Sequence, residues 1–101
     1  MNQNLLKQAR QLQEQLARIQ EELANETVTG LAGSGAVSVT LDGHGNLRSV
    51  KVDKAAVDPE DVETLEDLIA VAVNDATQKA QEASSKRMGA LTGGLRIPGL
   101  T

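Results

Sequence analysis

The sequence contains no cysteine, phenylalanine, tyrosine or tryptophan, and it has a single histidine. Without cysteine there is no disulfide framework, thiolate metal site or thiol redox chemistry. Without aromatic residues the core must be aliphatic, and the stacking surfaces used by binders of single-stranded nucleic acid are missing. No apolar run approaches the length of a membrane span, and the first residues do not form a secretory signal. We therefore expect a cytoplasmic chain without a membrane partner.

Residues that could carry catalysis or bind a metal are equally scarce. His44 lies between two glycines, with no second histidine or cysteine to complete a typical metal site. Asp42, His44 and Asn46 have the spacing of the first ligands of a calcium loop. However, Leu47 stands where that loop needs glycine, and Asp53 stands where it needs glutamate. With no nucleophile beside a base and no phosphate-binding loop, the sequence predicts a protein that is not an enzyme and has no cofactor, metal or small-molecule substrate.

The first part of the chain has the apolar spacing of a coiled-coil helix. Six apolar residues follow one another at intervals of four and three, with polar residues between them: Leu5, Ala9, Leu12, Leu16, Ile19 and Leu23. A helix from Asn2 to Ala24 would be about 34 Å long, whereas a compact domain of this size has a radius of gyration of about 13 Å. We expect this helix to project beyond its own core or to lie against a second subunit.

The middle of the chain has the alternation of β-strands. Residues 27–29 favour strand, residues 36–41 and 47–52 alternate, and residues 42–46 have the composition of a hairpin loop. We interpret Gly30, Gly33, Ser34 and Gly35 as a flexible turn or bulge. Leu47, Val50 and Val52 do not share one strictly alternating face, which predicts a register irregularity in the last strand.

A second long helix follows, with Asp58 as the expected N-cap and Pro59 at its first position. Its apolar stripe narrows from leucine, isoleucine and valine to alanine, so we expect residues 78–88 to extend away from the core. Gly89 and the glycines at 93 and 94 are predicted to end it. The sequence thus predicts an α+β fold, α-β-β-β-α, with a small antiparallel sheet and two long helices. We expect one domain over residues 1–92 and a flexible tail over residues 93–101.

Charge is distributed unevenly along the chain, whose formal net charge is −4. Residues 1–20 carry three cations against one acid, and residues 76–101 carry four cations against one acid. Between Asp53 and Asp75 eight acids face a single lysine. The ends are therefore basic and the middle is acidic, a pattern compatible with ordinary solvated helix faces or with a polyanionic partner at the ends.

Three segments together resemble the YbaB/EbfC family of bacterial nucleoid-associated proteins. They are residues 7–13 (KQARQLQ), residues 65–76 (LEDLIAVAVNDA) and residues 88–94 (MGALTGG). The resemblance covers nearly the whole chain. It implies a tweezer-like homodimer that binds double-stranded DNA with little sequence preference, localises to the nucleoid and contributes to nucleoid organisation and gene regulation.

The resemblance also implies which side chains would contact phosphates on the projecting arms: Lys7, Arg10, Arg18, Lys79, Lys86 and Arg87. The six apolar residues of the first helix would form the dimer or helix seam. One alternative stays open, a non-enzymatic adaptor or small chaperone that uses coiled-coil arms to hold another protein. A regulatory subunit of a larger enzyme is a third.

Overall fold

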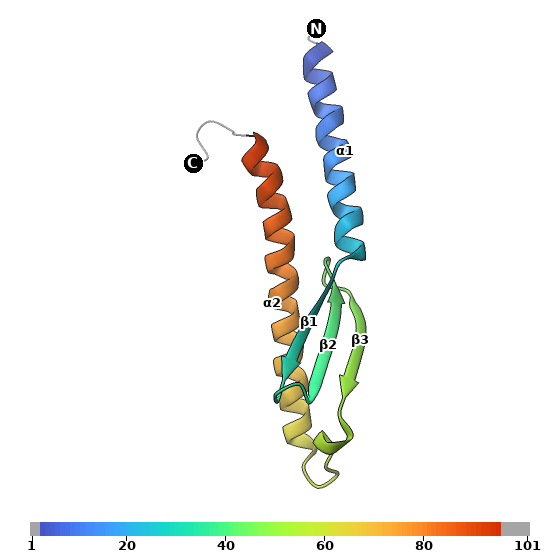
Figure 1. Cartoon of the computed structure of the whole chain (residues 1–101), viewed down its shortest axis with the longest axis vertical. Coiled ribbons are helices and arrows are strands. Elements are labelled where there is room, and N and C mark those ends of the chain that lie inside the picture. The colour runs from blue at the N-terminus through green and yellow to red at the C-terminus, as the bar shows by residue number, and fades with distance from the viewer. Residues whose placement is uncertain (1–2, 96–101) are drawn as a thin grey trace.

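The computed structural model describes residues 3–95 and contains two long helices joined through a small sheet (Figure 1). In chain order the elements are α1 (Gln3–Asn25), β1 (Thr27–Ala32), β2 (Val37–Asp42), β3 (Leu47–Val52), the 3-10 turn η1 (Lys54–Ala56) and α2 (Val62–Leu95). The strands form one antiparallel sheet in the order β1-β2-β3. The predicted α-β-β-β-α fold is confirmed.

The molecule is long and narrow. It measures 71 × 26 × 16 Å and its radius of gyration is 19.5 Å, against about 13 Å for a compact domain of 100 residues. Much of the excess comes from α1, which continues past the end of the sheet, and from the far half of α2, which extends in the same direction (Figure 1). The prediction that the first helix projects beyond its own core is confirmed.

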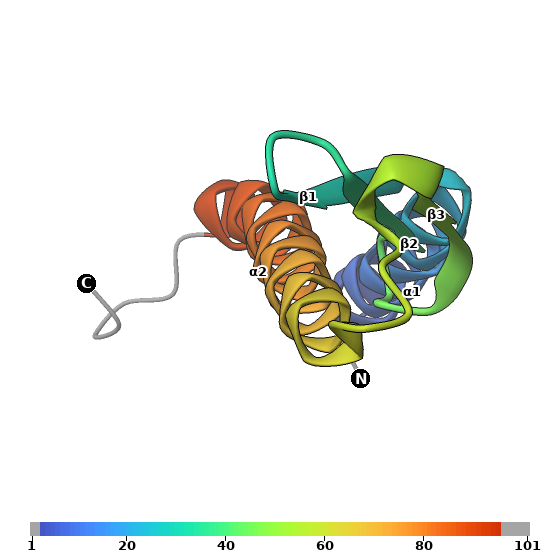
Figure 2. The ribbon, with the colours of Figure 1, turned by 90° about the horizontal axis from the view of Figure 1, so that it is seen from below.

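The core lies between α2 and one face of β1 and β2 (Figure 2). Val37, Val39 and Leu41 alternate along β2 and are buried on that face. They meet the narrow stripe of α2 predicted from the sequence, in which Ala72, Ala76 and Ala80 are buried. Small side chains on the helix let its backbone come close to the sheet, so a chain without aromatics still closes a core.

Gly30 is the place where this close approach is tightest, and here the sequence interpretation was wrong. The turn between β1 and β2 starts only at Gly33, and Gly30 lies inside β1. A Cβ atom on Gly30 would lie 2.2 Å from the carbonyl oxygen of Ala72 and 2.3 Å from the backbone nitrogen of Ala76. The glycine is therefore required by helix packing and not by a turn.

α2 packs against β1 and β2 and leaves β3 largely uncovered. Its pairing with β2 shifts between Thr40 and Leu41, which confirms the predicted irregularity. The pairing places Leu47 and Val50 opposite Leu41 and Val39, on the α2 side of the sheet. They nevertheless remain 61% and 45% exposed, so part of the apolar face of the sheet is uncovered.

The boundaries of α2 differ from the predicted ones. Asp58 does not cap the helix; it accepts a hydrogen bond from the amide of Glu60 in the preceding turn. Asp61 is the cap, accepting hydrogen bonds from the amide of Thr64 (3.3 Å) and from its hydroxyl (2.6 Å). At the other end α2 passes through Gly89 and ends at Leu95. Residues 96–101 of the predicted tail lie outside the described residues. Neither long helix, as far as residues 3–95 describe it, contains an apolar stretch of the kind that spans a membrane.

Candidate nucleic-acid interface

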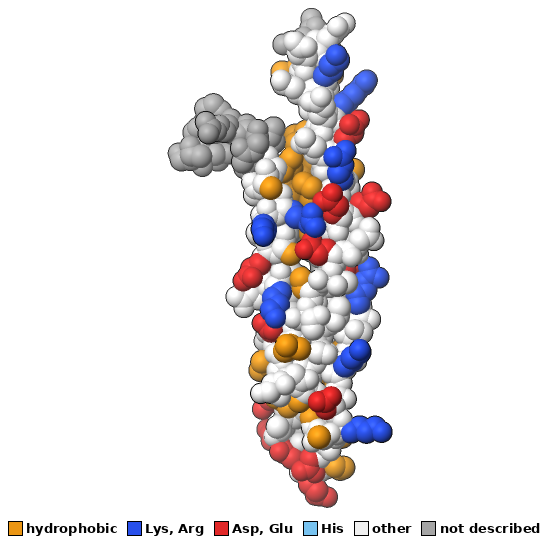
Figure 3. Space-filling model, viewed as in Figure 1, with side chains coloured by type: hydrophobic (Ala, Val, Ile, Leu, Met, Phe, Trp, Pro, Cys, Tyr) orange, Lys and Arg blue, Asp and Glu red, His pale blue; other side chains and the backbone are white. Residues whose placement is uncertain are grey.

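The predicted cations of α1 lie along its projecting part. Lys7, Arg10 and Arg18 are all exposed, and none of them forms an ion pair with another described residue. In Figure 3 basic side chains gather at the far end of this helix, while acidic side chains gather at the opposite end of the molecule. The arm therefore presents guanidinium and ammonium groups that are available to bind phosphate.

The cations predicted on α2 differ in whether they have an ion-pair partner. Lys86 resembles the cations of α1. Lys86 is exposed and has no ion-pair partner in the described part of the chain. Arg87, by contrast, is bound between two carboxylates. Its Nη1 lies 2.6 Å from Glu22 of α1 and its Nε lies 2.8 Å from Glu26. The hydrogen bond with Glu26 raises the pKa of Arg87. This arginine joins α2 to the end of α1.

Lys79 also has a structural partner. Its Nζ donates to the carbonyl oxygen of Thr29 (2.9 Å) and lies 3.1 Å from Asp75. The same carboxylate accepts a hydrogen bond from the amide of Leu31 (3.0 Å). Two side chains of α2 thereby bind backbone groups of β1, the edge strand, which fastens the helix to the sheet and covers that edge. The amide of Leu31 and then Lys79 lower the pKa of Asp75.

The predicted apolar seam of α1 changes its environment from one end to the other. Leu23 is buried, with 2% of its surface exposed. Leu12, Leu16 and Ile19 are half-buried, and Leu5 and Ala9 are exposed. Figure 3 shows apolar side chains in the gap between the two helices. Along this gap lies a groove of ≈ 420 Å³ that is lined by Gln15, Arg18, Ile19, Glu22, Arg87, Ala90 and Leu91.

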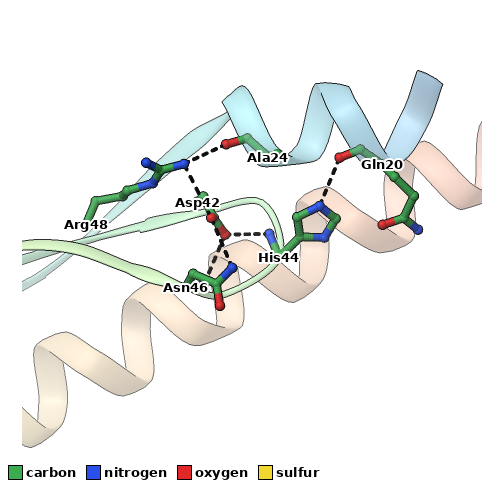
Figure 4. Close-up of polar contacts among 6 residues, drawn as sticks. All are labelled: Gln20, Ala24, Asp42, His44, Asn46 and Arg48. Atoms are coloured by element: carbon green, nitrogen blue, oxygen red, sulfur yellow. Dashed lines mark hydrogen bonds and ion pairs between the residues drawn. The ribbon is translucent and has the colours of Figure 1, made fainter. Parts of the chain in front are cut away.

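The C-terminal end of α1 is held by the loop between β2 and β3 and by Arg48 at the start of β3 (Figure 4). The last carbonyl groups of a helix have no partner within it and need donors from elsewhere. Here the amide of Gly43 donates to the carbonyl oxygen of Leu23 (2.8 Å), and Arg48 Nη2 donates to that of Ala24 (2.9 Å). His44 Nε2 lies 2.9 Å from the carbonyl oxygen of Gln20, so this nitrogen carries the proton of the bond.

Asp42 organises the same loop. Its side chain is almost fully buried and accepts hydrogen bonds from the amides of His44 (2.9 Å) and Asn46 (3.0 Å). Arg48 Nη2 lies 3.6 Å from the carboxylate. The hydrogen bond from the amide of Asn46 is the largest of several effects that lower the pKa of Asp42. The loop that has calcium-like spacing in the sequence thus has its acid occupied by backbone donors, and no group of metal ligands occurs in the part of the chain described.

Sequence reasoning missed the residues that hold the arm in place. No sequence pattern points to Glu22, Glu26 or Arg48, and the sequence presents His44 only as a candidate metal ligand. The residues that meet here are distant in sequence: 65 positions separate Arg87 from Glu22, and 24 separate His44 from Gln20. The only local signal is a basic residue, Arg48, soon after a glycine-containing hairpin, and that signal does not identify a helix end.

Comparison with known proteins identifies the family. Residues 1–95 match the YbaB/EbfC DNA-binding family. The chain belongs to this family. A nucleoid-associated protein of Roseiflexus castenholzii is 52% identical over 100 residues, covering 98% of this chain and 99% of the relative. A nucleoid-associated protein of Syntrophobacter fumaroxidans is 52% identical over 97 residues, covering 96% and 88% respectively.

The fold has a counterpart among solved structures. The crystal structure of an uncharacterized protein from Helicobacter pylori matches with a TM-score of 0.75 at 23% identity, covering 95% of this chain and 99% of that one. At this identity the match concerns the fold alone. The YbaB/EbfC family is described by DNA binding and not by an enzymatic activity, so the exposed cations of the arms are the features to examine for its function.

Proposed function

We propose that this protein is a nucleoid-associated protein that binds double-stranded DNA with little sequence preference through the exposed cations of its helical arms. The observation that carries the proposal is the exposure of Lys7, Arg10, Arg18 and Lys86 on a projecting pair of helices, in a chain that belongs to a DNA-binding family. Contacts between cations and phosphates provide affinity that does not depend on base sequence. Its place in the cell would then be the nucleoid, where it contributes to DNA organisation and gene regulation.

Lys79 and Arg87 have a different part in this proposal. The family resemblance implies both as phosphate contacts, but each already binds acceptors within the chain. Contact with DNA would require them to exchange these partners or to share their remaining donors. We therefore assign the main phosphate contacts to Lys7, Arg10, Arg18 and Lys86, and we assign to Lys79 and Arg87 the support of the arms.

The direct test is fluorescence anisotropy of labelled duplex DNA, measured at several salt concentrations with two matched double variants. Lys7→Ala/Arg10→Ala removes two cations from the arm, and Lys51→Ala/Lys54→Ala removes two exposed cations from the sheet end of the molecule. Each phosphate contact adds about 0.9 to the slope of log K against log salt. Only the arm variant should lose affinity and slope. Equal loss in both variants, or no binding by the wild type at low salt and micromolar protein, would reject the proposal.

We further propose that the protein acts as a homodimer, which doubles the number of arms. The uncovered α2-side face of β3 supports this, because Leu47 and Val50 expose apolar surface directly beside the core. Exposed apolar surface of this kind is typical of an interface. Replacing Val50 with aspartate should convert the dimer to a monomer in light scattering coupled to size exclusion, while Lys51→Asp, on the neighbouring position of the same strand, should not.

The adaptor alternative predicts a different result in the same experiments. Leu5 and Leu6 are exposed at the far end of α1 and could contact another protein. In that case binding to a partner would depend on Leu5 and Leu6 and would be insensitive to the loss of Lys7 and Arg10. Salt-sensitive DNA binding that requires the two cations is the outcome that favours the DNA proposal.

A further inference from the structure

The direction of the α1 arm is fixed near one end of the helix. The amide of Gly43, the side chain of Arg48 and the ring of His44 all bind carbonyl groups within the last turns of α1. Leu23 is buried against Gly43, in the loop between β2 and β3. The opposite half of α1 is exposed around most of its circumference. The contacts with the hairpin therefore restrain α1 at its C-terminal end, and its N-terminal half projects without them.

Small changes at the base produce large changes at the tip. Lys7 lies about 24 Å from Leu23 along the helix axis at the usual rise per residue. A tilt of about 10° at the base would move Lys7 by about 4 Å at that length. Successive phosphates of one DNA strand are about 3.4 Å apart along the duplex axis. A modest tilt therefore displaces the cation by more than the axial rise between successive phosphates.

We propose that Arg48 and His44 are positioning residues, which set the direction of α1 and thereby place its cations on DNA without contacting DNA themselves. The inference rests on the proposed function for its DNA consequence, whereas its statement about the arm can be measured without DNA. Arg48 is suited to the role because it links the carboxylate of Asp42 (3.6 Å) to the carbonyl oxygen of Ala24 (2.9 Å). A cation at this place also stabilises the negative end of the helix dipole.

Gly43 allows the hairpin to approach the backbone of α1 closely. A Cβ atom at this position would lie 2.6 Å from the carbonyl oxygen of Leu23 and 2.9 Å from its Cα atom. Both are backbone atoms of α1, so the helix end itself would have to shift to accommodate a methyl group. Gly43→Ala should therefore push the C-terminal end of α1 away from the hairpin.

The arm direction can be measured by pulsed electron spin resonance. The chain has no cysteine, so spin labels attach only to cysteines introduced at Gln13 on α1 and Gln78 on α2, both exposed positions. Dilution with unlabelled protein isolates the distance within one chain. We expect the distribution to broaden or shift in Arg48→Ala, His44→Ala and Gly43→Ala. It should stay that of the wild type in Lys51→Ala, which removes an exposed cation from the same strand, and Arg48→Lys should restore it in part.

The DNA readout separates positioning from phosphate contact. We expect Arg48→Ala and His44→Ala to bind duplex DNA several-fold more weakly, because an arm with a less defined direction must be ordered on the duplex. Its cations still reach phosphates, so the salt slope should fall by less than the ~0.9 that loss of a phosphate contact would cause. Because Arg48→Ala also removes the cation beside the buried carboxylate of Asp42, His44→Ala is expected to fold even where Arg48→Ala does not. An unchanged distance distribution in both Arg48→Ala and His44→Ala would overturn the inference, even if Gly43→Ala shifted it. If the wild type bound no DNA, the proposed function would fail while the distance measurement would still decide the role of the hairpin.

Discussion

Arg87 of α2 and Glu22 of α1 form an ion pair of 2.6 Å between two helices whose far ends otherwise project from the sheet. The same guanidinium binds Glu26, just before β1. A planar guanidinium presents several donors in fixed directions, which suits it to hold two carboxylates at once. The contact links α2, α1 and the residue that precedes β1, and it thereby supports the arms.

Removal of this contact should lower stability more than removal of its neighbour. We expect Arg87→Ala to lower the thermal unfolding temperature, because it leaves Glu22 and Glu26 facing one another without their shared cation. Lys86→Ala makes the same change in charge at the adjacent position, which forms no ion pair with another described residue, and should leave the unfolding temperature near that of the wild type. Calorimetry of the two variants measures the difference, and equal unfolding temperatures would show that Arg87 does not support the arms.

Gly30 should tolerate no side chain. Gly30→Ala places a Cβ atom within 2.3 Å of the α2 backbone, and overpacking of this kind costs about 1–3 kcal/mol, occasionally more. The matched control is Gly89→Ala, where, apart from the neighbouring helix backbone, no atom of the described residues lies within 4 Å of the added atom. In a helix interior alanine is favoured over glycine by about 1 kcal/mol, so the control should be neutral or stabilising. Urea unfolding of both variants tests the contrast, which a neutral Gly30→Ala would contradict.

The apolar seam of α1 should contribute to stability at its base only. Leu23 is 2% exposed and Leu5 is 66% exposed. Removal of a buried leucine side chain costs about 2–5 kcal/mol, so Leu23→Ala should lower the free energy of unfolding by an amount in that range. Leu5→Ala should leave it nearly unchanged when urea unfolding is measured at the same protein concentration. A large loss in Leu5→Ala would mean that the tip of the seam is buried in an assembly.

Acid should weaken the fold through Asp42 and Asp75. Hydrogen bonds from backbone amides, led by that of Asn46 for Asp42 and that of Leu31 for Asp75, lower the pKa of both groups. A carboxyl group with a lower pKa in the folded state stabilises the fold fully above its unfolded pKa of about 3.9. That stabilisation is lost as the pH falls through the lower folded pKa.

The corresponding experiment is urea unfolding between about pH 5 and pH 2. The wild type should lose stability as the pH falls, and Asp75→Asn should lose less over the same interval because it has no proton to take up there. Asp67→Asn, at an exposed position on the same helix, controls for the loss of one negative charge. Parallel curves for the wild type and Asp75→Asn would contradict the assigned role of this carboxylate.

The sequence was sufficient for the elements because their signals are local. The alternation of β2 and the alanine stripe of α2 each reflect which face the element buries. The four-and-three spacing of α1 marks the apolar side of a helix whose buried residue is Leu23. The start of α2 was placed too early because Asp58 and Asp61 both precede the helix and both accept amide hydrogen bonds. Only the geometry of the turn between them decides which one is the cap.

The support of the arms could not be read from the chain because it depends on distant pairs. A glycine inside a strand and a glycine in a turn look alike in sequence, and the role of Gly30 is set by α2, more than 40 positions further on. In the same way Lys79 and Arg87 have the character of free cations until β1 and α1 bring their acceptors to them. These partners distinguish Lys79 and Arg87 from Lys86 only once the fold is known.

The opposed charges at the two ends of this 71 Å molecule give it a large electric dipole moment. The field of a polyanion would orient the protein before contact, so that the arms approach first. This orientation would raise the association rate above that of randomly oriented collisions. At about 0.1 M salt the Debye length is near 10 Å, so the acidic end would not feel the duplex bound at the other end. DNA covered by this protein would then display an outer layer of carboxylates, which discourages neighbouring covered duplexes from adhering to one another.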